Sequence, residues 1–199
     1  PSANGGWFAL RLPEHGAAMV ISLLTDPVWV SASSLGLALL LGAAGLHKLR
    51  DRAGFAQVLQ HYGLLPGALV KPMTLLLGPL ELLCAAGLLS AWRVPAALLA
   101  AALLLLYAGV MALSLLQGRR IADCGCHLGR QSQAVSAPLV WRNLLLSLLA
   151  LNLLQTPGAR ETGLFDALLI GALLICGGVF YLLANTLIAK QHTARELSL

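Results

Sequence analysis

The sequence predicts an all-α integral membrane protein, a bundle of about five transmembrane helices with one amphipathic helix at the membrane interface. Of its 199 residues, 58% are hydrophobic and 11% are charged, whereas a soluble domain carries roughly 25% charged residues. The mean hydropathy is +0.82. The apolar residues form runs near the length of about 20 residues with which a helix crosses the hydrocarbon of a bilayer. We therefore expect lipid to surround the chain.

Five apolar runs define the spans of a single expected domain over residues 28–188. The second run contains Pro79 and Glu81, and the fourth is short and begins with Arg142 and Asn143, so a four-helix count stays open. Polar side chains in such runs normally face the bundle interior, because an ionised group in lipid is costly. The small residues from Gly42 to Gly45 would let neighbouring helices approach closely. The five runs cover residues 28–46, 73–89, 94–116, 139–154 and 164–188.

The segment between the first two runs, His47 to Pro66, predicts the amphipathic helix. Its apolar residues recur at spacings of three and four, a pattern typical of a helix that lies at the membrane surface. Proline would end this helix at its last position. A plain connector is the alternative. His47 and Lys48 are both expected to be interfacial anchors. The apolar residues are Phe55, Val58, Leu59 and Tyr62, and the basic residues expected to face head groups are Lys48, Arg50 and Arg52.

Polar tails are expected at both ends, over residues 1–27 and 189–199. The basic residues between the runs predict the orientation, because cytoplasmic loops of membrane proteins are rich in Lys and Arg. With five spans, the amino terminus lies outside and the carboxy terminus in the cytoplasm. The loop 117–138 then begins on the cytoplasmic side. One side carries Arg11, Arg93 and Arg160, and the other carries Lys48, Arg50, Arg52, Lys71, Arg119, Arg120, Arg130, Arg142, Lys190 and Arg195.

The net charge of +5 does not indicate nucleic-acid binding. The basic residues stand singly or in pairs between apolar runs and form no basic stripe with interleaved aromatic groups. Motifs of nucleotide-binding and hydrolytic enzymes, such as a P-loop, HExxH or GxSxG, do not occur. We therefore expect the lipid bilayer as a partner and no nucleic acid.

The loop after the third run carries the most unusual local sequence, Asp123-Cys124-Gly125-Cys126-His127. A Cys-Gly-Cys segment can close a small disulfide ring, since glycine removes the side-chain clash of a tight backbone. Closure over so few residues strains the bond, and strained disulfides are readily reduced. Cys124 and Cys126 are therefore the candidate catalytic pair for thiol–disulfide exchange.

The surroundings of this pair favour the thiolate, which is the form that attacks disulfides. Four arginines create a positive potential, and the start of the following helix would add to it. Asp123 opposes this effect but is outnumbered. We expect Arg119, Arg120 and Arg142 to tune the thiolate, with Arg130 as the fourth arginine.

Two alternatives remain for the loop. The cysteines could be inert, with the arginines serving only as membrane flanks. Cys124, Cys126 and His127 could instead hold a soft metal such as zinc or copper, since they offer sulfur and imidazole ligands. Stable structural zinc sites usually use wider spacing and four ligands, which argues against a permanent site.

The remaining cysteines, Cys84 and Cys176, lie in apolar runs and are expected to pack as small hydrophobic residues. Passing electrons through the bundle is their alternative role. Glu81 precedes Cys84 by three residues and shares its helix face, where a hydrogen bond to another helix is expected and proton handling is the alternative. A quinone is the candidate cofactor, because His61 and Tyr62 could approach its head group at the interface.

Three segments together resemble the methylamine utilisation protein MauE family and its DoxX-like relatives, namely GLHKLRDRAGFAQVLQHYGLLP, GPLELLCAAGLL and QGRRIADCGCHLG. The resemblance covers about residues 35–155. His127 departs from it, since an aromatic residue is commoner there, which favours the metal alternative slightly. The matching residues are Lys48, Phe55, Tyr62, Pro66, Glu81, Gly87, Gly118, Cys124, Gly125, Cys126 and Gly129.

The resemblance implies a bacterial inner-membrane protein that works with a thioredoxin-like thiol protein, so that a disulfide-rich periplasmic client forms its correct bonds. We predict that Cys124 and Cys126 cycle between dithiol and disulfide. A soft-metal carrier and a non-catalytic assembly subunit are the competing hypotheses. A periplasmic client conflicts with a cytoplasmic loop, unless the loop re-enters the bundle, electrons cross through Cys84 or Cys176, or the helix count differs.

Overall fold

A computed structural model of the chain describes residues 12–64, 66–118 and 135–196, and all regular secondary structure in those residues is α-helical. The prediction of an all-α membrane protein is thereby confirmed. The helices are α1 (Leu12–Leu24), α2 (Pro27–Arg50), α3 (Arg52–Tyr62), α4 (Gly67–Leu88), α5 (Arg93–Leu116), α6 (Ala137–Asn152) and α7 (Leu164–Glu196).

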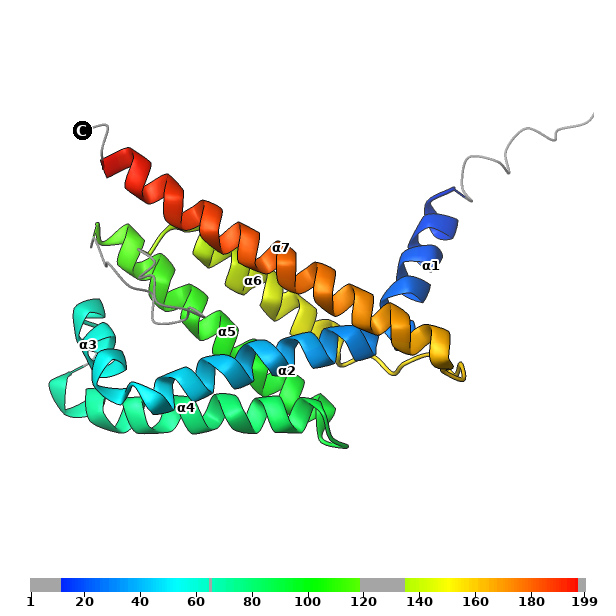
Figure 1. Ribbon diagram of the computed structural model, residues 1–199, viewed down its shortest axis with the longest axis horizontal. Helices are drawn as coiled ribbons and strands as arrows, with labels where there is room; N and C mark the ends of the chain where they lie inside the picture. Colours follow the sequence, from blue (N-terminus) through cyan, green and yellow to red (C-terminus); the bar gives the residue numbers. More distant parts are fainter. Residues whose placement is uncertain (1–11, 65, 119–134, 197–199) are drawn as a thin grey trace, which may run out of the picture.

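Five of these helices, α2, α4, α5, α6 and α7, alternate in direction along the bundle (Figure 1). The main packing pairs are α2 with α4 and α5 with α6, joined by α4 with α5 and α2 with α7. Each of the five contains most of one predicted apolar run. Four are long and apolar enough to cross a membrane, α7 through its residues 164–188. The chain is therefore a multi-pass membrane protein.

Helix α6 is the short member of the bundle. Its 16 residues span about 24 Å at 1.5 Å per residue, less than the hydrocarbon thickness of about 30 Å. It nevertheless packs closely, since Leu139 and Ala150 are fully buried. Helix α7 lies along one edge of the bundle, and most of its apolar side chains are exposed, as expected of a helix that faces lipid.

The amino-terminal segment differs from the polar tail expected for residues 1–27. It contains α1, whose second half exposes Met19, Val20, Ile21 and Leu23. This apolar stretch was too short to predict a span, yet it is long enough to continue a helix. Asp26 then separates α1 from α2, because its carboxylate accepts a hydrogen bond from the backbone N–H of Val28 at 2.8 Å and caps the new helix.

Helix α3 is an amphipathic helix and not a plain connector. Its start is capped by Asp51, whose carboxylate accepts a hydrogen bond from Gly54 N–H at 2.9 Å, and it ends at Gly63, which adopts a left-handed φ of 59°. It is shorter than the predicted segment, because residues 47–50 belong to α2. Phe55 and Tyr62 are buried, so the apolar face of α3 packs onto the bundle against α4.

Glycines bring α2 and α4 into close contact. A Cβ added to Gly45 would lie 2.8 Å from the carbonyl oxygen of Gly78 and 3.1 Å from the Cβ of Glu81. This finding confirms that the small residues near Gly45 allow a close approach of helices. The contact places Glu81 against α2, one turn before Lys48.

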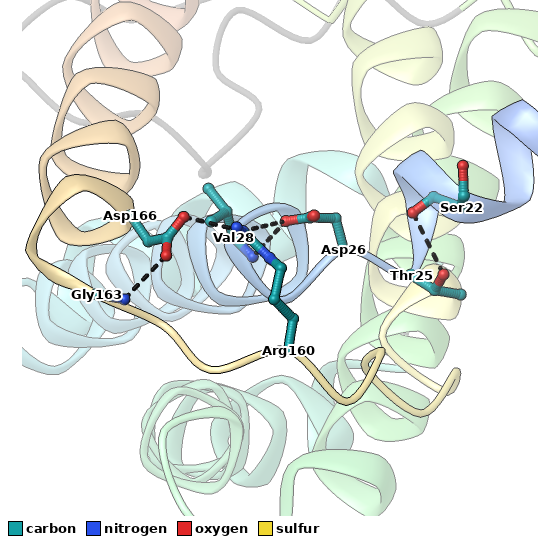
Figure 2. Close-up of polar contacts among 7 residues, drawn as sticks. All are labelled: Ser22, Thr25, Asp26, Val28, Arg160, Gly163 and Asp166. Carbon is teal, nitrogen blue, oxygen red and sulfur yellow. Dashed lines mark hydrogen bonds and ion pairs between the residues drawn. The ribbon is translucent and has the colours of Figure 1, made fainter.

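At the end of the bundle opposite α3, polar contacts around Arg160 join three segments of the chain (Figure 2). Its guanidinium donates to the Asp166 carboxylate at 2.9 Å and reaches Asp26 at 3.5 Å. Asp166 also accepts from Gly163 N–H at 2.9 Å, and Gly158 N–H donates to the carbonyl of Thr25 at 2.9 Å. These contacts hold the connection between α6 and α7 to the start of α2.

Candidate functional site

The predicted Cys-Gly-Cys site lies outside the described residues, as do the neighbours assigned to it. The helices that precede and follow this segment do define where it is attached. Helix α5 ends at Leu116 and α6 begins at Ala137, both at the end of the bundle that carries α3 (Figure 1). The residues concerned are Arg119, Arg120, Asp123, Cys124, Gly125, Cys126, His127 and Arg130.

A buried polar cluster lies towards the same end and joins three helices. Lys48 of α2 forms an ion pair with Glu81 of α4, with Nζ 2.5 Å from Oε1. The Tyr107 hydroxyl of α5 donates to the same Oε1 at 2.7 Å. Lys48 and Glu81 are each only 1% exposed. Because charges inside a membrane protein normally pair with one another or mark a functional site, this cluster is the candidate site of the described structure.

Aromatic rings surround the ammonium group of the pair. Lys48 Nζ lies 5.3 Å from the ring centroid of Phe55 and 5.1 Å from that of Tyr107. At these distances the ring faces stabilise a cation. The other carboxylate oxygen, Glu81 Oε2, is buried and has no hydrogen-bond partner among the described residues. The cluster thus combines a paired charge with an unused acceptor.

The cluster borders a cavity of about 230 Å³ between α3, α4 and α5. One wall consists of the apolar face of α3, and Lys48 is the only charged residue that lines the cavity within the described chain. Leu106, at its rim, is 54% exposed, so the cavity reaches the outer surface of α5. The lining residues are Lys48, Phe55, Val58, Leu59, Tyr62, Leu64, Met73, Leu77, Leu106, Tyr107, Val110 and Met111.

The cavity also adjoins the first described residues before α6. Val135 is 6% exposed and packs in one hydrophobic cluster with Tyr62, Met111 and Leu139. Tyr62 and Met111 line the cavity as well. The described residue next to the Cys-Gly-Cys segment on its carboxy-terminal side is therefore in the same packing unit as the cavity wall.

Sequence reasoning was right about Glu81 and wrong about Lys48. The interhelical hydrogen bond expected of Glu81 is confirmed. Lys48 is not an interfacial anchor, because its long side chain reaches a partner 33 residues away. A lysine at the end of an apolar run resembles the basic residues that flank membrane spans. The only sequence signal for an ion pair was the single Glu, Glu81, in the next apolar run. Tyr107 was missed, since an isolated Tyr in an apolar run carries no signal.

The other predicted residues are dispersed. Cys84 is fully buried in the apolar core, one turn from Glu81, as expected of a packing cysteine. Cys176 is free and exposed on α7, contrary to the packing expected for it. Of the two residues considered for a quinone, Tyr62 lines the cavity and His61 is exposed.

Arg142 joins α6 to α7. Its Nη1 donates to Asn185 Oδ1 at 2.8 Å, and the guanidinium lies 5.5 Å from the Tyr181 ring centroid. Its predicted effect on the thiolate concerns residues outside the described part. Among described residues, no group of three metal-binding side chains occurs.

The model of one family, methylamine utilisation protein MauE, matches residues 26–156. The chain is 42% identical over 129 residues to a methylamine utilization protein MauE of Paracoccus denitrificans, which covers 64% of this chain and 69% of the relative. It is 37% identical over 150 residues to the protein of that name from Methylorubrum extorquens, covering 74% and 81%. A relative of that name from Methylophilus methylotrophus is 45% identical over 106 residues, covering 53% and 56%.

No solved structure matches the chain. The family match includes α2 to α6, and hence the Lys48–Glu81 pair, the cavity and the Cys-Gly-Cys segment. The chain therefore belongs to the methylamine utilisation protein MauE family.

Proposed function

We propose that this chain is a membrane thiol–disulfide redox protein of methylamine utilisation, with Cys124 and Cys126 as the exchanging pair. The observation that carries the proposal is the Cys-Gly-Cys sequence in the segment that joins α5 to α6, flanked by arginines. The names of the family and of the relatives supply methylamine utilisation as the process. Within methylamine utilisation, we propose that the protein supports disulfide formation in a periplasmic protein.

Thiol–disulfide exchange transfers the disulfide from the membrane protein to the client in two steps. A thiolate of the client or of a thioredoxin-like partner attacks the Cys124–Cys126 disulfide and forms a mixed disulfide. The second thiol of the client then attacks this bond, the client leaves with a disulfide, and Cys124 and Cys126 are left as thiols. Two electrons and two protons have moved to the membrane protein, and a quinone is the candidate acceptor that would take both and restore the disulfide.

The neighbouring charged residues support this chemistry. Arg119 and Arg120 favour the thiolate, Arg142 adds a positive charge from the second turn of α6, and Asp123 moderates them. Gly125 permits the tight ring. The described cysteines offer no second pair, since Cys84 is buried and Cys176 is exposed on α7. We place the protein in the bacterial inner membrane, where a periplasmic client and a membrane acceptor are both within reach.

Trapping of the mixed disulfide tests the proposal. With Cys126→Ala, the Cys124 thiolate can attack a disulfide of the partner, which releases one partner thiol and leaves a mixed disulfide that no Cys126 thiol can resolve. A covalent complex with the partner should therefore accumulate and disappear on reduction. Cys176→Ala is the matched control, because it removes an exposed thiol outside the motif and should leave trapping unchanged. The proposal fails if neither Cys124→Ala nor Cys126→Ala traps a protein and the double variant matures its client normally.

Metal carriage is the second candidate, favoured by His127 beside the two cysteines. It predicts purified protein with stoichiometric zinc or copper bound, and loss of that metal in His127→Phe. Under thiol exchange, the same substitution leaves the mixed disulfide intact. A non-catalytic assembly subunit would mature the client in the absence of both cysteines.

A further inference from the structure

We propose that the cavity between α3, α4 and α5 binds an acyl chain of a bilayer phospholipid, which lies beneath the middle of α3. The described lining of the cavity comes from α2 to α5 and from Leu64. The site is therefore defined without the Cys-Gly-Cys segment, and it is independent of thiol exchange.

The lining of the cavity excludes water. Among its described residues, eight are aliphatic or methionine and three are aromatic. The ammonium group of Lys48 pairs with Glu81. It also lies against the ring faces of Phe55 and Tyr107, and the Tyr107 hydroxyl donates to Glu81 as well. Even with the hydroxyl of Tyr62, the lining offers fewer polar partners than the roughly two to four that a buried water requires.

A dry cavity of this size favours an apolar occupant. Its volume of about 230 Å³ exceeds the volume of about 150 Å³ at which an apolar protein cavity takes up benzene. The side chains around an empty space lose dispersion contacts, and the cost grows with the volume left unfilled. A hydrocarbon group restores these contacts without needing a hydrogen-bond partner.

The packing of α3 leaves this space beneath its middle. Phe55, near the start of α3, and Tyr62, at its end, are buried in two different hydrophobic clusters. Val58 and Leu59 lie between them, are only half-buried and line the cavity. Helix α3 is thus anchored at both ends and bridges a gap in between. An acyl chain in the gap supplies the missing packing partner of Val58 and Leu59.

The depth of the cavity matches the acyl chains of one leaflet. Tyr107 precedes the end of α5 at Leu116 by nine residues, which is about 13 Å along the helix. On α4, Met73 follows the first residue, Gly67, by six residues, which is about 9 Å. One leaflet contributes about half of the hydrocarbon thickness of roughly 30 Å. The cavity therefore lies below the head groups and beside the chains.

The outer surface of α5 opens the cavity to these chains. Leu106 at the rim is 54% exposed, and the adjacent Leu105 is 46% exposed. Gly109, about one turn further along, has no atom within 4 Å of an added Cβ. Since this part of α5 is a candidate membrane span, lipid surrounds the rim. The lining selects only for apolarity, so mass action fills the cavity with the most abundant hydrocarbon at that depth, a phospholipid acyl chain.

Photo-labelling of the full chain in vesicles tests the site. The vesicles consist of phosphatidylethanolamine and phosphatidylglycerol, and a small fraction of the phosphatidylethanolamine carries a diazirine halfway along one acyl chain. Peptide mass spectrometry should locate adducts on Met111, which lines the cavity and is 2% exposed, or on Val58 and Leu59. Adducts confined to exposed residues such as Leu105 would overturn the proposal, because another part of the protein would then fill the cavity.

The depth is tested with a second probe that carries the diazirine in the head group. It should label the ends of the helices and leave Met111 unlabelled, since the cavity lies below the head groups. Equal labelling of Met111 by both probes would contradict the proposal.

Three variants separate the cavity from the general lipid-facing surface. Val110→Trp fills the cavity from α5 and Leu59→Trp fills it from α3, whereas Leu113→Trp adds the same side chain to the exposed surface of α5. Adducts on Met111 should fall about tenfold or more with either filling variant and stay unchanged with Leu113→Trp. Unchanged labelling of Met111 in a folded filling variant would contradict the proposal. If neither filling variant folds, the adduct on Met111 of the unmodified chain decides by its presence or absence.

The same labelling separates the lipid site from thiol exchange. A variant with both Cys124→Ala and Cys126→Ala should keep the adduct on Met111 while it loses the trapped mixed disulfide. An adduct on Met111 without any trapped partner would support the lipid site and contradict the exchange function. A trapped partner without this adduct would support the exchange function and contradict the lipid site.

Discussion

The ammonium of Lys48 on α2 lies 2.5 Å from the carboxylate of Glu81 on α4, with both side chains almost fully buried. The pair connects two helices that approach each other closely at Gly45 and Gly78, and it lies beside a cavity that borders lipid. The same two groups therefore link α2 to α4 and place a charge pair inside the bundle.

Removing one partner of this pair should destabilise the protein strongly. Either Lys48→Met or Glu81→Met leaves a buried ionisable group without its counter-charge, which costs about 3–5 kcal/mol. The double variant should cost much less than the sum, since it leaves no charge behind. The free energies of unfolding of the wild type, the two single variants and the double variant, measured in mixed micelles, form a double-mutant cycle. Additive costs would show that the two groups do not interact.

Close packing of α2 on α4 should not tolerate a side chain at position 45. The Cβ of Gly45→Ala would meet the backbone oxygen of Gly78 at 2.8 Å, and such overpacking costs about 1–3 kcal/mol. Gly109→Ala on α5 is the control, because nothing lies within 4 Å of the added atom. Thermal unfolding should show a lower midpoint for the first variant only. Equal midpoints would mean that the helices can separate freely.

The Tyr107 hydroxyl should stabilise the protein through its bond to Glu81. Tyr107→Phe removes the 2.7 Å hydrogen bond, and a hydrogen bond to a charged group is worth about 1.5–3 kcal/mol. Tyr181→Phe is the matched control. Tyr181 contacts Arg142 through its ring, and phenylalanine retains that ring. We expect a clear loss of unfolding free energy in the first variant and a change within about 0.5 kcal/mol in the second.

The membrane orientation can be measured at the two ends of α5. Ser90 and Gln117 are both exposed and lie just outside opposite ends of this helix. In a background without natural cysteines, an impermeant maleimide should label Ser90→Cys in intact cells and Gln117→Cys only after permeabilisation, because the basic residues gather at the end of Gln117. The reverse pattern would place the Cys-Gly-Cys segment outside and remove its conflict with a periplasmic client.

The helices could be predicted from the sequence because a helix that crosses a bilayer requires a run of about 20 apolar residues. Their ends were less predictable. Helix α4 starts at Gly67, six residues before the predicted run begins at Met73. Lys71 and Pro72 end the apolar run in the sequence, but the helix continues through both residues. Helix α1 was missed because its apolar stretch is shorter than a span.

The polar cluster could be predicted only in part. Glu81 in an apolar run requires a partner, and an interhelical bond followed from that requirement. The identity of the partner depends on which helices pack together and at what height, which periodicity does not specify. Lys48 and Tyr107 were therefore found only when α2 and α5 were placed beside α4. The cavity depends on the same three-dimensional arrangement of α3.

The central claim is that Cys124 and Cys126 open and close a disulfide bond during function, and its most direct measurement uses one peptide. Trypsin cleaves after Arg120 and Arg130 and releases residues 121–130, which contain both cysteines and neither Cys84 nor Cys176. Cells growing on methylamine are quenched in acid, free thiols are alkylated with a light reagent, and the remainder with a heavy reagent after reduction. We predict that a dithiothreitol pulse converts the peptide to the doubly light form and that the heavy form returns after washout. A peptide that keeps one labelling state throughout would contradict the account.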